Sequence, residues 1–250
     1  MGRDNRSQFH ALRARFGNGR GTDRTVLPLG IEEVDHKLPG GGLVRGALHE
    51  VAGGANGAVD GAAAAAFAAG VAARTGGRVL WCFAQPDLFP PALAQCGLTL
   101  DRVVFFECRD ETAILGCFED ALRHGGLSAV VAEIGHLSLK ASQRLQFAAE
   151  VSGTMGIAVR RWRRQTEARD FGTPTAASTR WRVTELEAQS LPVRGVGPGR
   201  WLLELMRARG GECADFEVEA FDNAQGYLGL PAYLADRPAA SVAGGRRAAS

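Results

Sequence analysis

The sequence predicts an α/β fold in which a mainly parallel β-sheet is flanked by helices and antiparallel strands extend the sheet at its C-terminal side. The first observation is an alternation, between residues 47 and 162, of short apolar runs with segments of about 10 to 15 residues that suit helices. The second is a glycine-rich turn directly after the first apolar run. The third is that strand-like runs separated by turns replace the helical segments after residue 175. Alternating strands and helices are typical of parallel sheets covered on both faces.

The strands of the parallel part are expected where apolar residues run together between turn signals. These runs are residues 47–52, 78–84, 103–107, 129–134 and 157–162. The helices expected between them are residues 62–74, 88–96, 112–124 and 139–152. Alanine dominates the first helix, and Ile114, Phe118 and Leu122 share one face of the third at helical spacing. The antiparallel strands are expected at residues 180–186, 200–208 and 216–221, along one edge of the same sheet.

Three regions are expected along the 250 residues: a basic N-terminal arm (1–26), a core domain (27–235) and a disordered tail (236–250). The first 25 residues carry six arginines against two aspartates, and the end of the chain is rich in Ala, Ser, Gly and Arg. No apolar run approaches the roughly 18 to 20 residues that cross a bilayer, and no secretory signal follows the N-terminus. We therefore expect a cytoplasmic protein with no membrane partner.

The cysteines and histidines do not predict a metal site. The five cysteines are widely spaced without a Cys-x-x-Cys pair, and no histidine stands at metal-ligand spacing from another ligand residue. Buried free thiols are expected, and neither a metal nor another cofactor. The serines form no Gly-x-Ser-x-Gly elbow, so a nucleophilic hydrolase has no support.

The glycine-rich turn stands where a parallel sheet often binds phosphate, but its residues do not suit that role. Glycines let successive backbone N–H groups converge on phosphate oxygens, and the loop also needs a lysine and a Ser or Thr for magnesium. The spacing from the first glycine places the lysine position at Ala58 or Val59 and the hydroxyl position at Val59 or Asp60, and an aspartate there repels phosphate. We therefore expect no nucleotide at this degenerate loop, which comprises Gly53, Gly54, Gly57, Val59 and Asp60.

Six segments carry a resemblance: LPLGIEEVD (27–35), LPGGGL (38–43), GALHEV (46–51), RWRV (180–183), WLLEL (201–205) and RGG (209–211). The first three are similar to the segment that precedes the ATPase loop of RecA. Together the six more closely resemble the ImuA-type proteins, which are RecA-like relatives found in bacterial mutagenesis operons. The resemblance covers roughly residues 27 to 225 and implies a RecA-like core.

The resemblance also implies which catalytic residues are missing. The glutamate that activates water in RecA-type enzymes falls at Gln85, which cannot accept a proton. The metal-associated acidic residue falls at Ala132 or Glu133, depending on register. We therefore expect a protein that is not an enzyme.

Two alternatives to that expectation stay open. One is an active RecA-like, DNA-dependent ATPase with an atypical phosphate site, in which Arg78 or Arg160 supplies the missing cation to the loop. The other is a SulA-like cell-division inhibitor, which shares a degenerate relative of this fold. It is disfavoured because such proteins are shorter and lack the long segment before the loop.

A basic and aromatic cluster follows the last expected parallel strand: Arg160, Arg161, Trp162, Arg163 and Arg164. By resemblance, RecA-type proteins carry a mobile DNA-contacting loop here. Guanidinium groups neutralise phosphates, and an indole stacks on an unpaired base for roughly 1 to 3 kcal/mol. Two other interpretations remain: a solvated strand end, in which Arg161 and Arg163 point outward and Trp162 inward, and a surface for a protein partner.

The function that the resemblance implies is that of an accessory factor in DNA-damage-induced translesion synthesis and mutagenesis. Such proteins act with ImuB, a Y-family-like polymerase homologue, and with an error-prone replicative-type polymerase. The expected mechanism is docking to ImuB, with RecA and single-stranded DNA as further expected partners. Phe9 and Phe16 in the arm are candidate partner contacts. They either anchor in a neighbouring subunit, which would allow self-association, or pack on the protein's own core.

Overall fold

The computed structural model describes residues 25–162, 168, 171–188, 199–222 and 227–229. Within this part of the chain, one sheet contains the strands β3 (Leu48–Gly53), β4 (Val79–Phe83), β5 (Val103–Glu107), β6 (Ala129–Ile134), β7 (Met155–Arg160), β8 (Thr179–Leu186), β9 (Arg200–Ala208), β10 (Ala214–Asp222) and β11 (Tyr227–Gly229). Their order across the sheet is β11-β10-β9-β8-β3-β7-β6-β4-β5. A separate antiparallel pair consists of β1 (Val26–Leu27) and β2 (Leu43–Val44).

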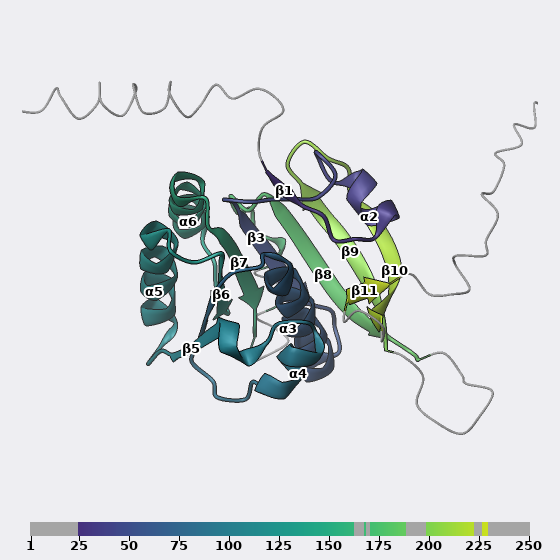
Figure 1. The fold of residues 1–250 in the computed structure, drawn as a ribbon, viewed down its shortest axis with the longest axis horizontal. Coiled ribbons are helices and arrows are strands. Elements are labelled where there is room, and N and C mark those ends of the chain that lie inside the picture. The colour runs from purple at the N-terminus through teal and green to yellow at the C-terminus, as the bar shows by residue number, and fades with distance from the viewer. Residues whose placement is uncertain (1–24, 163–167, 169–170, 189–198, 223–226, 230–250) are drawn as a thin grey trace, which may run out of the picture.

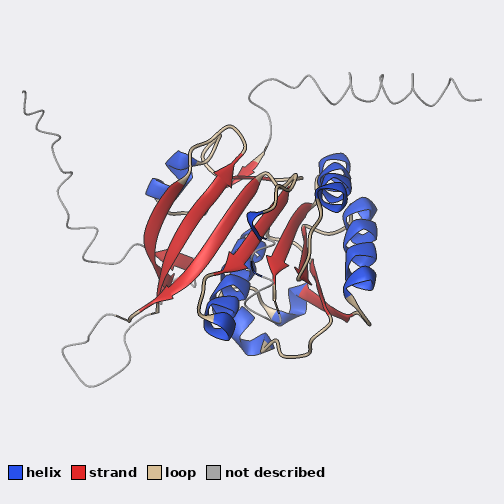
Figure 2. Ribbon diagram, turned by 180° about the vertical axis from the view of Figure 1, so that it is seen from behind, coloured by secondary structure: helices blue, strands red, loops and turns tan. Residues whose placement is uncertain are grey.

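Helices cover both faces of the parallel part of the sheet, whereas α2 (Glu32–Lys37) lies over the antiparallel strands (Figure 1). The helices on the parallel part are α3 (Gly57–Arg74), α4 (Pro90–Gln95), α5 (Glu111–His124) and α6 (Leu139–Ser152), with a 3-10 turn η1 (Leu100–Arg102). Helices α3 and α4 lie on one face, and α5 and α6 lie side by side on the other (Figures 1 and 2). Two apolar cores therefore form, one on each side of the sheet.

The predicted fold class is confirmed by the strand pairing. Strands β3 to β8 run parallel to their neighbours, whereas β8–β9, β9–β10 and β10–β11 pair antiparallel. Strand β8 is the junction because it lies parallel to β3 on one side and antiparallel to β9 on the other. The C-terminal strands thus extend one edge of the same sheet, as the sequence predicts.

Residues 26–44, for which the sequence predicts no secondary structure, cover one face of the antiparallel strands. The side chains of Val34 and Leu38 join the same core as Trp201 and Leu203 of β9. The Asp35 carboxylate of α2 binds the residues that precede the helix, because it accepts hydrogen bonds from the Leu29 and Gly30 N–H groups at 2.7 and 2.9 Å. No described helix covers the opposite face of β8, β9 and β10 (Figure 2).

Among the predicted boundaries that differ from the structure, two concern the candidate site. Helix α3 begins at Gly57 rather than at residue 62, because the glycine-rich turn itself contributes the first helical turn. Strand β7 ends at Arg160 rather than at Trp162, which lies beyond the strand. In the described part of the chain, no helix is both long and apolar enough to cross a membrane.

Candidate functional site

The degenerate loop joins β3 to α3 at the carboxyl edge of the parallel strands. Two of its glycines, Gly53 and Gly54, are required by close packing. A side chain at Gly53 would collide with the backbone of Asp60, and one at Gly54 would meet the Asp60 carboxylate 2.6 Å from its Cβ. The Gly54 N–H donates to the Val183 carbonyl at 2.9 Å, which ties the loop to β8. The loop therefore packs directly on its own helix and on the neighbouring strand.

The Asp60 side chain is fully buried inside this loop. Its Oδ2 accepts a hydrogen bond from the Asn56 N–H at 2.8 Å, and its Oδ1 accepts one from the Glu185 N–H of β8 at 2.9 Å. Asp60 lies in the first turn of α3, where the helix dipole favours negative charge. The carboxylate thus accepts a loop N–H group, that of Asn56, of the kind that binds phosphate in other parallel sheets.

Neither arginine proposed as a substitute cation lies at the loop. Arg78 directly precedes β4, at the amino edge of the sheet, where its carbonyl accepts hydrogen bonds from Ser128. Arg160 is buried, and its Nη1 lies 2.5 Å from Glu50 Oε1. Neither of these two arginines therefore supplies the cation that the atypical-ATPase alternative requires.

Arg160 belongs to a buried cluster of charged side chains from the neighbouring strands β7, β3 and β8. The Glu50 carboxylate also lies 2.9 Å from Arg180 Nε and accepts a hydrogen bond from Thr175 Oγ1 at 2.7 Å. Arg160 Nη2 in turn donates to the Gly135 carbonyl at 2.7 Å. With its side chain fully buried, Arg160 cannot contact a DNA phosphate, and this candidate DNA contact is a structural residue instead.

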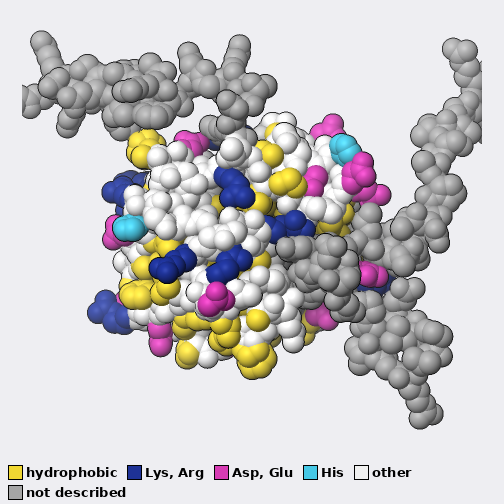
Figure 3. Space-filling model, in the orientation of Figure 1, with side chains coloured by type: hydrophobic (Ala, Val, Ile, Leu, Met, Phe, Trp, Pro, Cys, Tyr) yellow, Lys and Arg dark blue, Asp and Glu magenta, His cyan; other side chains and the backbone are white. Residues whose placement is uncertain are grey.

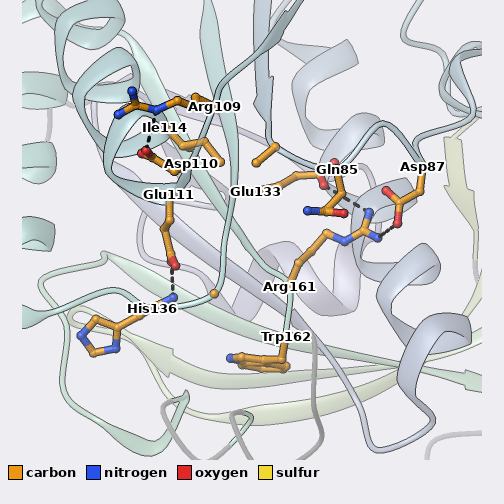
Figure 4. A pocket seen from close by; sticks show the side chains of 12 residues that line it. Gln85, Asp87, Arg109, Asp110, Glu111, Ile114, Glu133, His136, Arg161 and Trp162 are labelled. Carbon is orange, nitrogen blue, oxygen red and sulfur yellow. Dashed lines mark hydrogen bonds and ion pairs between the residues drawn. The ribbon is translucent and has the colours of Figure 1, made fainter.

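A cleft of about 950 Å³ opens at the carboxyl ends of β4 to β7 (Figure 4). Its lining residues come from several separate segments of the chain. They are Ala84, Gln85, Asp87, Arg109, Asp110, Glu111, Ile114, Glu133, Gly135, His136, Arg161 and Trp162. The carboxylates of this set outnumber its guanidinium groups, so the charge of the cleft is mixed with an acidic excess.

Arg161 is held by two of these carboxylates. Its Nη2 lies 2.6 Å from Asp87 Oδ2 and its Nη1 lies 3.1 Å from Glu133 Oε2, as Figure 4 shows. Glu133 also accepts a hydrogen bond from the indole N–H of Trp81 at 2.9 Å. Burial raises the pKa of Glu133 above its ordinary value, although Arg161 and the Trp81 hydrogen bond oppose that rise. Of the two sequence candidates for the acidic position, Glu133 lines the cleft.

Trp162 forms one wall of the cleft and packs against a residue beyond the basic cluster. Its ring meets Phe171 edge-on at 5.9 Å, and the Arg160 guanidinium lies 5.8 Å from its centre. Trp162 is therefore partly buried, which agrees in part with the inward-packing interpretation. Arg163 and Arg164 lie outside the described residues, as do Phe9 and Phe16.

Sequence reasoning missed three acidic residues that shape this region. Glu50 is an acid within an apolar run, which is a signal for a buried ion pair. Asp87 anchors Arg161. Glu111 Oε1 accepts the His136 N–H at 2.5 Å and so joins α5 to the segment after β6. The last two contacts link residues far apart in sequence, and no local pattern predicts them.

The histidines and cysteines have structural surroundings. His49 is buried between Thr179 Oγ1 and the Val44 carbonyl, and burial lowers its pKa to about 4. The described cysteines are free thiols; Cys82, Cys96 and Cys108 are buried as predicted, whereas Cys213 is exposed. No group of His, Cys, Asp or Glu in the described residues is arranged to hold a metal ion.

Comparisons with known proteins agree with this architecture. No protein-family model matches the chain. Among solved structures, the RadB recombinase matches it with a TM-score of 0.55 and 19% identity, over 77% of this chain and 95% of RadB, which supports a RecA-like core. Protein ImuA of Caulobacter vibrioides, in two strains, is 36% identical in an alignment over 241 residues. The alignment covers 92% of this chain and 98% of that protein. The chain therefore belongs to the ImuA family.

Proposed function

We propose that this ImuA-family protein is a non-catalytic accessory factor in DNA-damage-induced translesion synthesis and mutagenesis, and that it acts by docking to an ImuB-type polymerase homologue. Membership of the ImuA family supports the part of the proposal that concerns mutagenesis. The observation that carries the mechanism is Asp60, a buried carboxylate that accepts one backbone N–H from the loop in which an ATPase would hold phosphate and a second from the adjacent strand β8.

Charge opposes nucleotide binding at this loop. Two like charges about 4 Å apart repel by about 4 kcal/mol at an effective dielectric constant of 20. Among the described residues, the hydrogen-bond partners of Asp60 are the backbone N–H groups of Asn56 and Glu185, and no Lys or Arg side chain pairs with it. A triphosphate would therefore meet a negative charge without the lysine that normally neutralises it.

The groups around the cleft also favour a role without hydrolysis. Gln85 lines the cleft at the position where the resemblance places the water-activating glutamate. The Glu133 carboxylate is already engaged by Arg161 and Trp81. The loss of a general base lowers the rate of a hydrolysis reaction by about 10²- to 10⁴-fold.

The outer side of α6 is our candidate docking surface for the ImuB-type partner. Leu139, Phe147 and Val151 are 48%, 52% and 62% exposed, and they follow one side of the helix. Clustered exposed apolar side chains are typical of protein-interaction sites. On the face drawn in Figure 3, by contrast, Lys and Arg side chains lie in separate small groups, not in a continuous basic stripe of the kind that binds nucleic acid.

Binding to the ImuB-type protein encoded by the same genome tests the docking proposal. We expect the two purified proteins to form a complex without ATP. The double variant Phe147→Ser/Val151→Ser should weaken it at least about tenfold, which corresponds to about 1.4 kcal/mol. Asp120→Ser/His124→Ser changes two exposed polar residues of the neighbouring helix α5, outside the candidate docking surface, and serves as the control. Failure of the wild-type proteins to associate would refute docking to ImuB.

A separate titration tests the non-catalytic part. Wild-type protein should show neither a thermal shift with Mg²⁺-ATP nor phosphate release in the presence of single-stranded DNA. Tight ATP binding with turnover would instead support the active-ATPase alternative. RecA, an error-prone replicative-type polymerase and single-stranded DNA are proposed as further partners, and each can be added to the binding assay in turn.

A further inference from the structure

The two oxygens of the Asp60 carboxylate bind two different parts of the fold. One oxygen accepts the N–H of Asn56, within the loop that precedes α3. The other accepts the N–H of Glu185, near the end of β8. A single buried side chain on α3 therefore connects the loop to the strand at which the sheet changes from parallel to antiparallel.

The neighbouring residues pack closely around the Asp60 carboxylate. Gly54 leaves just enough room, because a Cβ there would lie 2.6 Å from Asp60 Oδ2 and would also collide with Thr184 Oγ1. The carboxylate is fully buried, and its hydrogen-bond partners are backbone donors at 2.8 and 2.9 Å. Backbone N–H donors beside a helix N-terminus are the groups that bind a phosphate oxygen in a nucleotide site.

We propose that Asp60 is a built-in anion that replaces bound phosphate and locks the loop onto β8. The loop then keeps a ligand-bound arrangement permanently, without a ligand. This inference rests on the proposed function in one respect: it explains how a loop that binds no nucleotide stays ordered.

The proposal predicts a specific chemical rescue. Removal of the carboxylate leaves two partly buried N–H donors without their acceptor, which destabilises the fold. The same change removes the negative charge that excludes phosphate and opens a small space next to those donors. A free oxyanion supplied in solution should then occupy that space and restore part of the original stability.

The experiment compares wild type, Asp60→Ala and the control Asp120→Ala, which removes an exposed carboxylate from α5. Thermal unfolding is measured in sodium phosphate and in sodium chloride of equal ionic strength. We expect Asp60→Ala to lower Tm by about 3 °C or more in chloride. Phosphate should recover a large part of that decrease, while the wild type and Asp120→Ala respond equally to both salts. Isothermal titration with phosphate should detect binding to Asp60→Ala alone.

Asp60→Asn provides a second variant of nearly unchanged shape. It keeps one acceptor oxygen but replaces the other with an NH₂ donor, so we expect a smaller decrease in Tm and little rescue by phosphate. An Asp60→Ala protein that is as stable as wild type, or that phosphate does not stabilise, overturns the proposal. Those results leave docking to ImuB untouched, whereas ATP turnover by the wild type would contradict the proposed function itself.

Discussion

The guanidinium of Arg160 and the carboxylate of Glu50 form an ion pair in which both side chains are fully buried and Nη1 lies 2.5 Å from Oε1. Adjacent parallel strands supply the two residues, since Glu50 belongs to β3 and Arg160 to β7. Arg180 of β8 approaches the same carboxylate from the other side, at 2.9 Å. Three neighbouring strands are thus joined by one acidic residue, and a position that the sequence suggests as a DNA contact serves the sheet instead.

This geometry predicts unequal effects of substitution. Glu50→Gln leaves two buried guanidinium groups without a counter-charge and should cost about 3–5 kcal/mol of unfolding free energy. Arg160→Met should cost less, because Glu50 keeps Arg180 and Thr175 as partners. Urea denaturation of both variants measures the difference. An equal or greater cost in Arg160→Met would contradict the assigned network.

The buried His49 predicts a dependence of stability on pH. Its pKa falls from the ordinary 6.5 to about 4 in the folded protein, so the unfolded chain binds the proton more tightly. The contribution of neutral, buried His49 to the free energy of unfolding is complete above pH 6.5. As pH falls from 6.5 to about 4, this contribution is lost, and the free energy of unfolding decreases by up to about 3 kcal/mol. His49→Gln should flatten this part of the curve of unfolding free energy against pH. The same slope in the variant would assign the effect to other groups.

The Gly54 position predicts strong intolerance of a side chain. Gly54→Ala places a methyl group against the Asp60 carboxylate and Thr184, and should cost about 1–3 kcal/mol. Gly61→Ala is the matched control, because a Cβ at that helical position meets no heavy atom within 4 Å. It should raise stability by up to about 1 kcal/mol through helix propensity. Thermal unfolding of both variants gives the comparison, and equal effects would argue against the close packing of the loop.

Single-strand DNA binding, if it uses the basic cluster, should depend on its arginines unequally. Arg161 is already paired with Asp87 and Glu133, so Arg161→Ala should change affinity little. Arg163→Ala/Arg164→Ala should weaken binding and reduce the slope of log K against log salt by about 0.7 for each phosphate that is no longer neutralised. Fluorescence anisotropy at several salt concentrations measures both quantities. Equal slopes in all variants would remove the cluster from the DNA-binding surface.

The fold could be predicted from the sequence because its signals are local. Apolar runs and glycine pairs mark the strands and helices between residues 47 and 162, and the structure reproduces them closely. The start of α3 was missed because glycines at Gly57 and Gly61 hide the first helical turn. Helix α2 was missed because it has only 6 residues and its N-cap residue, Ile31, makes no capping side-chain hydrogen bond.

The candidate site was predictable only as a set of missing residues. The sequence shows that Val59 and Asp60 cannot act as a lysine and a magnesium-binding hydroxyl. It does not show that Asp60 turns inward to bind Glu185, because that contact joins residues 125 positions apart. The burial of Arg160 was equally hidden, since its partner Glu50 lies 110 positions away.

The attachment of the Asp60 carboxylate to α3 has a consequence for how the loop responds to its surroundings. A diffusing anion occupies a site in proportion to its concentration, whereas a tethered group has an effective concentration set by the chain. The concentrations of nucleotide and phosphate around the protein change with growth and starvation, but the effective concentration of a tethered side chain does not. Under the proposal that Asp60 replaces bound phosphate, we therefore expect the shape of this loop to be independent of the energy state of the cell.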